Sequence, residues 1–376
     1  METLSVFEIS FGFVLTFYVL QQVIFLYGFY KKLPINKNYE PFVSVIVAAR
    51  NEEKNIRSCI ESLSKLDYPE DKLEVIIVDD FSTDRTGEII SEFTSQFNFI
   101  KKIVPQKNII SYPGKTNAIA NGIELSKGEI IFTTDADCVV KPEWIKTTLK
   151  YFNENVGIVP GFTFQKSYSQ FTGMQNLDWI YLLTVAAGSI NLGVPLSCIG
   201  NNMAFRRDAY EKVGGYKNIK FSITEDFALL HKINRNTNYK VVYQSEPEGT
   251  NFSEPCLDWK SLYRQKHRWG TGGMDAPLIG FIVMLWGWAT HLFILLQVIF
   301  GTMFTLTLTV IKFLSDFIFL SLSLKKFKMM KELKYFFAFE IYFILYVLIL
   351  PAIVFFDRKV IWKDRQYSSD KYVNSL

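Results

Sequence analysis

The sequence predicts an α/β domain with a Rossmann-like, mostly parallel sheet and helices on both faces, flanked by transmembrane helices. Between residues 42 and 135, apolar runs of strand length alternate with segments whose apolar residues recur at helical spacing. This alternation is typical of a parallel sheet with helical crossovers. Residues 11–30 and 278–356 are instead dense in Phe, Leu, Ile and Val. Membrane segments are therefore expected on both sides of a more charged middle.

Three apolar runs form the centre of the predicted sheet: 42–49, 74–78 and 129–134. A helix is expected after the first run, because its apolar residues Ile56, Ile60 and Leu63 recur at helical spacing. Ser82, Thr83 and Asp84 are suited to cap a helix after the second run, and residues 114–125 predict another helix before the third.

Composition indicates a membrane protein and argues against a nucleic-acid-binding one. Of the 376 residues, 49% are hydrophobic and 34 are phenylalanines. The 41 basic and 37 acidic residues give a formal net charge of only +4, and no basic stripe crosses the middle of the chain. The four cysteines are scattered without a CxxC pair, which favours reduced cytosolic thiols over zinc ligands.

The first apolar segment, residues 11–30, predicts an uncleaved anchor, because its length suffices to cross a bilayer. A signal peptide is disfavoured, since the first ten residues contain two glutamates and no basic residue. Lys31 and Lys32 follow the segment, and the positive-inside rule then places the middle of the chain in the cytosol. We therefore expect an integral membrane protein of the plasma membrane.

About three hydrophobic segments are predicted after residue 277. Residues 278–324 are long enough for two helices divided near Gly301, and residues 335–356 form another. The basic loop before the last segment and the basic tail after it conflict under the positive-inside rule, which leaves an interfacial or re-entrant segment open. The expected regions are an anchor (1–32), a cytosolic α/β domain (33–277) and a membrane region with a short basic tail (278–376).

Acidic residues follow two of the predicted strands. Asp79 and Asp80 come after the second strand, and Asp135 and Asp137 come after the third. Open α/β sheets bind ligands beyond the carboxyl ends of their strands, so these carboxylates predict a ligand site. Mg²⁺ or Mn²⁺ bridging Asp135 or Asp137 to phosphate oxygens is the expected metal. The structural alternative is that each aspartate only caps a helix or forms a turn.

No glycine-rich phosphate loop is present. The run Pro113-Gly114-Lys115-Thr116 looks like the end of a P-loop, but Ile109 stands where that motif requires its first glycine. No GxGxxG motif occurs either. A bound nucleotide must therefore be held by other groups.

Two further clusters lie downstream, Thr224-Glu225-Asp226 and the run containing Gln265, Arg268 and Trp269. Taken singly, Thr224 is explained as a helix cap and Trp269 as a membrane-interface residue. The functional prediction rests on the ordered set of four clusters.

This ordered set resembles the membrane-bound glycosyltransferases of family 2, which have the GT-A fold and include cellulose, chitin and hyaluronan synthases and ceramide glucosyltransferase. The resemblance covers about residues 42–270. The matching motifs are Val78-Asp79-Asp80 with Ser82 and Asp84, Asp135-Ala136-Asp137, Thr224-Glu225-Asp226 and Gln265-x-x-Arg268-Trp269. Weaker matches include Ala49-Arg50-Asn51-Glu52, Gly114-Lys115 and Gly200-Asn201-Asn202.

The resemblance implies inverting transfer of a sugar from a nucleotide-sugar donor, expected to be a UDP-sugar, to a membrane lipid. Asp226 is the expected general base, with Glu225 orienting it or raising its pKa. The metal would lie on Asp135 and Asp137. The resemblance assigns the nucleotide sugar to Asp79, Asp80, Lys115, Asp135 and Arg268. It counts Gln265, Arg268 and Trp269 among the catalytic residues, with Trp269 shaping the acceptor end of the site.

Three alternatives remain. A processive polysaccharide synthase would use a glycan acceptor, although such enzymes usually have more membrane helices than this chain offers. A catalytically inactive sugar-nucleotide-binding membrane protein would keep the fold. A transporter would use charged residues within the spans, where Lys312, Asp316, Glu340 and His291 lie, but no helix repeat is visible. Lys312 and Asp316 are spaced to pair within one helix. A homo-oligomer or a partner subunit stays open.

Overall fold

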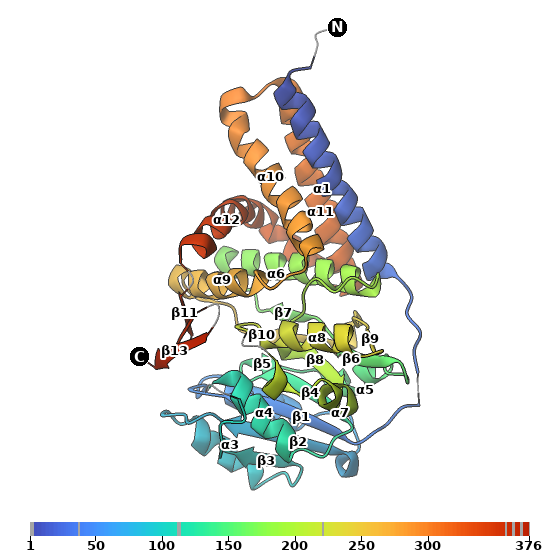
Figure 1. The fold of residues 1–376 in the computed structure, drawn as a ribbon, viewed down its shortest axis with the longest axis vertical. Helices are drawn as coiled ribbons and strands as arrows, with labels where there is room; N and C mark the ends of the chain where they lie inside the picture. The colour runs from blue at the N-terminus through green and yellow to red at the C-terminus, as the bar shows by residue number, and fades with distance from the viewer. Residues whose placement is uncertain are drawn as a thin grey trace. The chain divides into compact units, whose positions relative to one another are not determined.

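The structure is a computed structural model, and it describes residues 4–36, 38–110, 114–219, 222–357, 359–362, 365–368 and 371–375. The chain divides into two compact units (Figure 1). The sheet unit comprises Lys32–Gln165, Ser197–Glu254 and Trp362–Leu376. The helical unit comprises Met1–Lys31, Lys166–Leu196 and Pro255–Ile361.

A seven-stranded sheet forms the centre of the sheet unit, in the order β3-β2-β1-β4-β8-β6-β9. The first four of these strands are mutually parallel, β8 runs antiparallel to β4 and to β6, and β9 is parallel to β6. The predicted mostly parallel sheet is therefore confirmed. The strands are β1 (Val43–Ala49), β2 (Leu73–Asp79), β3 (Ile100–Ile103), β4 (Ile130–Asp135), β6 (Val156–Pro160), β8 (Met203–Arg206) and β9 (Lys240–Val241).

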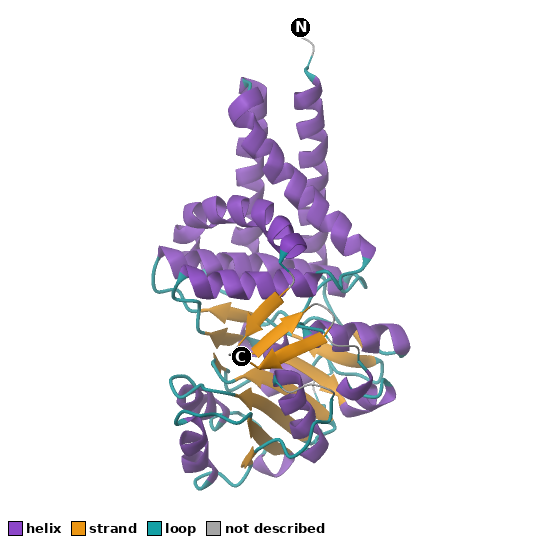
Figure 2. Cartoon of the chain, turned by 60° about the vertical axis from the view of Figure 1, so that its left-hand side comes forward, coloured by secondary structure: helices purple, strands orange, loops and turns teal. Residues whose placement is uncertain are grey.

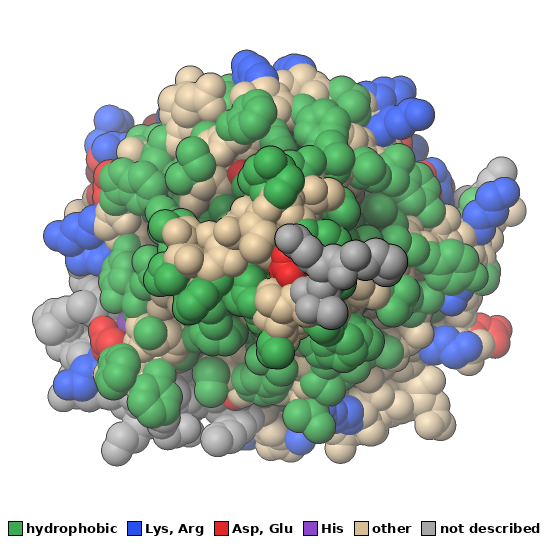
Figure 3. All heavy atoms as spheres, turned by 90° about the horizontal axis from the view of Figure 1, so that it is seen from above, with side chains coloured by type: hydrophobic (Ala, Val, Ile, Leu, Met, Phe, Trp, Pro, Cys, Tyr) green, Lys and Arg blue, Asp and Glu red, His purple; other side chains and the backbone are tan. Residues whose placement is uncertain are grey.

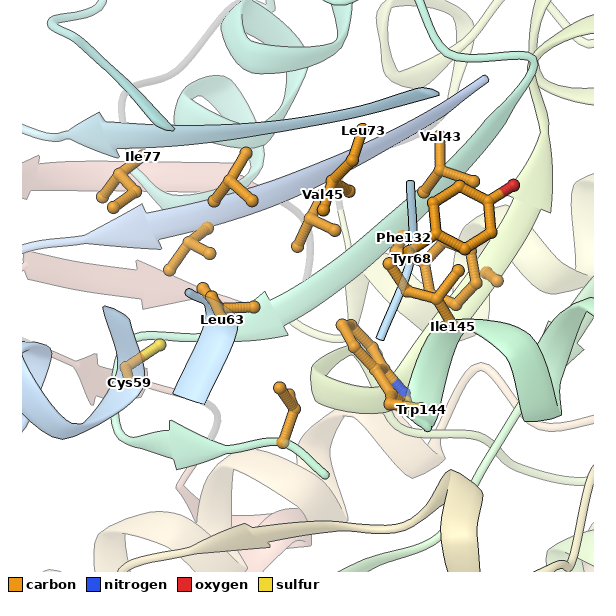
Figure 4. Close-up of a cluster of buried hydrophobic side chains, with 14 of the residues drawn as sticks. Val43, Val45, Cys59, Leu63, Tyr68, Leu73, Ile77, Phe132, Trp144 and Ile145 are labelled. Atoms are coloured by element: carbon orange, nitrogen blue, oxygen red, sulfur yellow. The ribbon is translucent and has the colours of Figure 1, made fainter. Parts of the chain in front are cut away.

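Helices cover both faces of this sheet, which explains why its central strands are apolar along their whole length. On one face, Val45 and Ile77 pack with Leu63 of α2, Phe132 and the fully buried Trp144 of α5 (Figure 4). On the other face α4 packs closely, since a Cβ added at Gly122 would lie 2.6 Å from a methyl carbon of Ile46. The helices are α2 (Ile56–Leu63), α3 (Thr86–Thr94), α4 (Lys115–Leu125), α5 (Trp144–Leu149), α7 (Arg207–Lys212) and α8 (Glu225–Asn236).

The chain also forms two smaller sheets and several short 3-10 helices. A three-stranded sheet in the sheet unit has the order β5-β10-β7, and another near the carboxyl terminus has the order β11-β12-β13. Their bounds are β5 (Cys138–Val139), β7 (Thr163–Gln165), β10 (Asn251–Ser253), β11 (Lys359–Trp362), β12 (Arg365–Ser368) and β13 (Lys371–Ser375). Short 3-10 helices span Glu70–Lys72, Gly200–Asn202, Tyr216–Asn218, Pro247–Gly249 and Met330–Tyr335.

Among the described residues, the helical unit contains four helices that are long and apolar enough to cross a membrane: Val6–Tyr30, Leu278–Phe300, Met303–Lys326 and Met330–Phe356. The predicted division near Gly301 is confirmed, since one helix ends at Phe300 and the next begins at Met303 with Thr302 as its N-cap. Seen from the end of the helical unit, hydrophobic side chains cover much of the visible face (Figure 3). The helices are α1 (Val6–Tyr30), α6 (Gln170–Asn191), α9 (Trp259–Gly273), α10 (Leu278–Phe300), α11 (Met303–Lys326) and α12 (Phe336–Phe356) (Figure 2).

Two glycines let α1 and α6 touch backbone to backbone. A Cβ added at Gly28 would lie 2.1 Å from the carbonyl oxygen of Gly188, and one added at Gly188 would lie 2.1 Å from the carbonyl oxygen of Phe25. Any larger residue at either position would force the two helices apart.

A charged cluster is buried among the membrane-type helices. Lys312 Nζ lies 2.9 Å from Asp316 Oδ2, as its spacing predicted, and 2.5 Å from Glu340 Oε2 of α12. Tyr18 and Gln22 of α1 donate hydrogen bonds of 2.7 and 2.5 Å to Asp316 Oδ1. We call Lys312, Asp316 and Glu340 the inner cluster. It ties three helices together at one level.

Candidate active site

The carboxyl ends of β1, β2 and β4 lie side by side, because β1 pairs with both other strands. Ala49 is opposite Asp79, and Ala48 is opposite Asp135. Parallel pairing thus places the first two acidic clusters at one edge of the sheet, although 56 positions separate Asp79 from Asp135 in the sequence (135 minus 79). This is the edge at which open α/β sheets bind their ligands.

Lys115 joins this edge to the third acidic cluster. Its Nζ lies 2.6 Å from Asp135 Oδ1 and 3.4 Å from Glu225 Oε1. Lys115 begins α4 directly after Gly114, whose φ of 124° is readily accessible only to glycine. Burial alone would lower the pKa of Lys115, but the charges of Asp135 and Glu225 outweigh it and the pKa is raised. The side chain is therefore an ammonium. We call Lys115, Asp135 and Glu225 the edge cluster.

Asp226 is held in the first turn of α8, beside Gly200. Its Oδ1 accepts a 2.8 Å hydrogen bond from the Phe227 backbone N–H. A Cβ added at Gly200 would lie 3.1 Å from Asp226 Oδ2, so glycine keeps space open next to that oxygen. Gly200 is in turn anchored to β4, because Thr133 Oγ1 donates to its carbonyl oxygen at 2.7 Å.

The structural alternative for Thr224 can be examined directly. Thr224 is the N-cap residue of α8, but among the described residues its side chain caps no backbone N–H of the helix. Its hydroxyl lies 3.2 Å from Ser222 Oγ instead. Helix capping by the Thr224 side chain therefore does not account for the Thr224-Glu225-Asp226 motif.

Asp135 and Asp137 flank the buried Ala136 and are both partly accessible. Cys138 Sγ lies 3.6 Å from Asp137 Oδ1, and burial, together with the charges of Asp137 and Asp135, raises the pKa of Cys138 so that the thiol stays protonated. In the described part of the chain, no group of three or more His, Cys, Asp or Glu side chains is arranged to hold a metal. Two carboxylates nevertheless suit Mg²⁺, which proteins commonly bind through one or two carboxylates plus substrate phosphates and water.

Asp79, the last residue of β2, and Asp80 directly after it are both buried. The Ser82 backbone N–H donates to Asp79 Oδ1 at 3.0 Å, and Lys102 Nζ lies 3.7 Å from Asp79 Oδ2. The Asp80 backbone N–H donates to the carbonyl oxygen of Ala49 at 2.8 Å. Asp79 thus has structural partners in addition to its position at the edge.

Sequence reasoning missed two residues that lie beside Asp79 and Asp80. Lys102 lies on β3, a strand that the sequence pattern did not reveal. Phe81 directly follows the two aspartates, is 57% exposed and has a φ of 56°, which is uncommon for a bulky residue. No sequence signal marks that backbone conformation, but an aromatic residue directly after two aspartates was visible.

Gln265, Arg268 and Trp269 lie on α9, a helix of the helical unit. Trp269 packs against Trp179 with ring centroids 4.6 Å apart, and Lys266 Nζ lies 4.3 Å from the Trp269 ring centroid. Lys266 also forms a buried ion pair with Asp178 of α6. The structure therefore gives Trp269 a packing role within the helical unit, while the carboxylates of the candidate site belong to the sheet unit.

Two family models match the sequence. The model described as glycosyl transferase family 2 matches residues 44–214. The model described as glycosyl transferase family group 2 matches residues 130–356, more than half of the chain.

Curated relatives have related names. The probable glycosyltransferase YdaM of Bacillus subtilis is 32% identical over 247 residues, which cover 63% of this chain and 56% of that protein. The β-monoglucosyldiacylglycerol synthase of Nostoc sp. is 30% identical, with coverages of 63% and 50%. The poly-β-1,6-N-acetyl-D-glucosamine synthase of Staphylococcus epidermidis is 27% identical, with coverages of 72% and 67%. The chain spans about half the length of the first two relatives.

A solved structure supports the fold assignment. The mannosyltransferase PcManGT from Pyrobaculum calidifontis, in complex with GDP-mannose and Mn²⁺, superposes with a TM-score of 0.58 and 18% identity. The match covers 89% of this chain and 97% of that one. The fold is therefore of the predicted GT-A type.

Proposed function

Since this chain belongs to glycosyl transferase family group 2, we propose that it transfers a sugar from a nucleoside diphosphate sugar, expected to be a UDP-sugar, to a membrane lipid with inversion at the anomeric carbon. One observation carries the proposal. Carboxylates of the Asp135 and Glu225 motifs converge on Lys115 at the ligand-binding edge of the sheet, in a chain with four helices apolar enough to cross a membrane.

Asp226 is the proposed general base. The acceptor hydroxyl gives its proton to the Asp226 carboxylate while its oxygen attacks the anomeric carbon opposite the diphosphate. The bond from the anomeric carbon to the diphosphate oxygen breaks, and the nucleoside diphosphate leaves with that electron pair. The hydrogen bond from Phe227 to Oδ1 fixes the carboxylate, and Gly200 leaves room beside Oδ2 for the acceptor hydroxyl.

Asp135 and Asp137 would hold Mg²⁺ or Mn²⁺, which when bound neutralises charge on the diphosphate as it departs. The similar mannosyltransferase structure contains Mn²⁺, which supports a divalent cation without choosing between the two metals. We further assign Asp79, Asp80 and Lys115 to the nucleotide and Arg268 to the diphosphate, for which its planar guanidinium is suited. Trp269 is assigned to the acceptor end, and Gln265 is counted among the catalytic residues.

The proposed setting is the plasma membrane, with the catalytic region in the cytosol. Lys31 and Lys32 directly follow α1 and support this orientation by the positive-inside rule. We propose three regions along the sequence: an anchor at 1–32, a GT-A region at 33–277 and a membrane region at 278–376. The helices α6 and α9 lie within the second region of the sequence and pack in the helical unit.

A processive polysaccharide synthase is the second candidate. The poly-β-1,6-N-acetyl-D-glucosamine synthase of Staphylococcus epidermidis matches over 72% of this chain, more than the glucosyldiacylglycerol synthase of Nostoc does. Both activities would use the same donor site and differ in the acceptor, so the product distinguishes them.

The test is a radiolabel transfer assay. Purified full-length protein in native lipid extract receives Mg²⁺ or Mn²⁺ and, one at a time, a panel of radiolabelled UDP- and GDP-sugars, followed by organic extraction. Label in the organic phase with one donor is the expected result, and Asp226→Asn is the control that should lose it. High-mass label in the aqueous phase would establish the polymer synthase instead. Nucleotide binding without transfer from any donor would contradict both activities.

A further inference from the structure

The edge cluster places one ammonium group where two functions meet. Asp135 belongs to the proposed metal pair, and Glu225 directly precedes the proposed base. Lys115 lies 2.6 Å from the first and 3.4 Å from the second, and its side chain is only 17% exposed. Three elements supply these residues: α4 and β4, which follow one another in the sequence, and α8, which lies far downstream. Removing the charge of one carboxylate should therefore change how strongly Lys115 pairs with the other.

Three carboxylates, those of Asp135, Glu225 and Asp226, act on Lys115 as negative charges. Carboxylates grouped in this way attract a divalent cation. A metal on a carboxylate oxygen lies about 2.1 Å from it, and Lys115 Nζ already lies 2.6 Å from Asp135 Oδ1. Two cations on that oxygen would repel each other, so metal binding at Asp135 Oδ1 requires Lys115 to move.

We propose that Lys115 is an internal counter-ion that keeps a divalent cation off the Asp135–Asp137 pair until a donor diphosphate arrives. This inference rests on the proposed function and deepens it. When a nucleoside diphosphate enters, Lys115 Nζ leaves Asp135 Oδ1 for the diphosphate oxygens, which frees Asp135 for the metal. Without a nucleotide, Lys115 neutralises Asp135 itself. Metal and donor then bind together, and the metal alone binds weakly.

The test measures Mn²⁺ affinity of the full-length protein in detergent, by the EPR signal of free Mn²⁺, with and without UDP. Lys115→Met should bind Mn²⁺ about tenfold more tightly than wild type in the absence of UDP, because a competing positive charge is gone. Glu225→Gln should have the opposite effect, because a nearby negative charge is lost and Lys115 then pairs more strongly with Asp135. This opposed pair of signs separates the counter-ion role from a general loss of structure.

Lys101→Met is the matched control. Lys101 pairs with the buried Glu74 at 2.8 Å in the same unit, on β3. Its replacement also removes one positive charge and one lysine–glutamate ion pair, yet it should leave Mn²⁺ affinity unchanged. Lys115→Arg retains the charge and should keep metal affinity without UDP low.

The outcomes distinguish this inference from the function on which it rests. If wild type binds Mn²⁺ tightly with UDP but Lys115→Met binds it no more tightly than wild type without UDP, the counter-ion role is wrong and the proposed function stands. If Lys115→Met does not fold, the sign for Glu225→Gln decides: tighter binding than wild type overturns the inference. If wild type binds UDP but does not bind Mn²⁺ in the presence of UDP, the proposed metal site is wrong, and so is the inference.

Discussion

The chain builds the same charge arrangement twice, one lysine between two carboxylates, and gives the two copies opposite surroundings. In the edge cluster the lysine-to-carboxylate distances are 2.6 and 3.4 Å, and in the inner cluster they are 2.9 and 2.5 Å. Access differs far more than geometry. The edge side chains are 17%, 31% and 10% exposed, whereas those of Lys312, Asp316 and Glu340 are 0%, 0% and 5% exposed.

The difference in side-chain exposure indicates which ion pairs can exchange partners. An arriving ligand can reach Lys115 and Asp135 and replace one contact with another. The inner cluster has no such access, and Asp316 is also held by Tyr18 and Gln22. Breaking a buried pair leaves an uncompensated charge, so the inner cluster can only hold the helices in place. The transporter alternative loses its main residues to this structural role.

The largest expected effect is on catalysis at the edge. Asp226→Asn should lower the transfer rate by about 10³-fold, because the amide cannot accept the acceptor proton. UDP affinity should stay near that of wild type in a binding assay, since Asp226 is not assigned to the donor. A rate within tenfold of wild type would remove Asp226 from the role of base.

Replacing the two lysines in turn tests whether access to water separates the inner cluster from the edge cluster. Lys312→Met should destabilise the protein by about 3–5 kcal/mol, because two buried carboxylates lose their partner. Lys115→Met should change stability less, since its partner Asp135 is 31% exposed and water can solvate that carboxylate. Thermal unfolding in detergent measures both variants. Equal losses of stability would show that access does not separate the clusters.

The dependence of transfer and of donor binding on a divalent metal tests the proposed role of Asp137. Chelation should stop transfer, and Asp137→Ala should weaken donor binding at least about tenfold in Mn²⁺ but leave the weaker metal-free binding unchanged. Calorimetric titration with UDP, with and without Mn²⁺, checks this expectation. An Asp137→Ala protein whose UDP affinity still rises fully with Mn²⁺ would place the metal elsewhere.

Arg268→Lys should lower kcat/KM about tenfold, because lysine keeps the charge but loses the planar fork that contacts a diphosphate. Steady-state transfer at varied donor concentration measures the change. Lys266→Arg is a contrasting variant on the same helix, because Lys266 is sealed against Asp178 and its replacement should reduce folding yield rather than kcat/KM. A fully active Arg268→Lys protein would favour the membrane-interface interpretation of that residue.

A smaller effect is expected from a partly buried histidine outside both clusters, whose titration should make stability depend on pH. His231 lies on α8, and its ring nitrogens have no hydrogen-bond partner among the described residues. Burial and then the nearby Arg235 lower its pKa from 6.5 to about 4. The unfolded chain therefore binds the proton first, and stability should fall as pH drops from 6.5 to 4. His231→Phe should flatten that part of the curve of unfolding temperature against pH.

Local patterns predicted the sheet edge and one ion pair, and long-range packing supplied the rest. The apolar runs ending in Asp79 and Asp135 indicated parallel strands, so their meeting at one edge followed from topology. The Lys312–Asp316 pair followed from helical spacing. Neither Glu225 at Lys115 nor Glu340 at Lys312 was predictable, because each contact depends on how separate helices pack.

The contact between Gly28 of α1 and Gly188 of α6 joins helices that are synthesised far apart in time. The sequence enters the sheet unit after α1, leaves it for α6 and then returns to it for β8, β9 and β10. During synthesis α1 therefore waits for its partner helix until most of the parallel strands have emerged. A shortened chain without α1 would leave the Gly188 surface of α6 exposed to water. We therefore expect that removing the four candidate membrane helices would not by itself give a soluble protein.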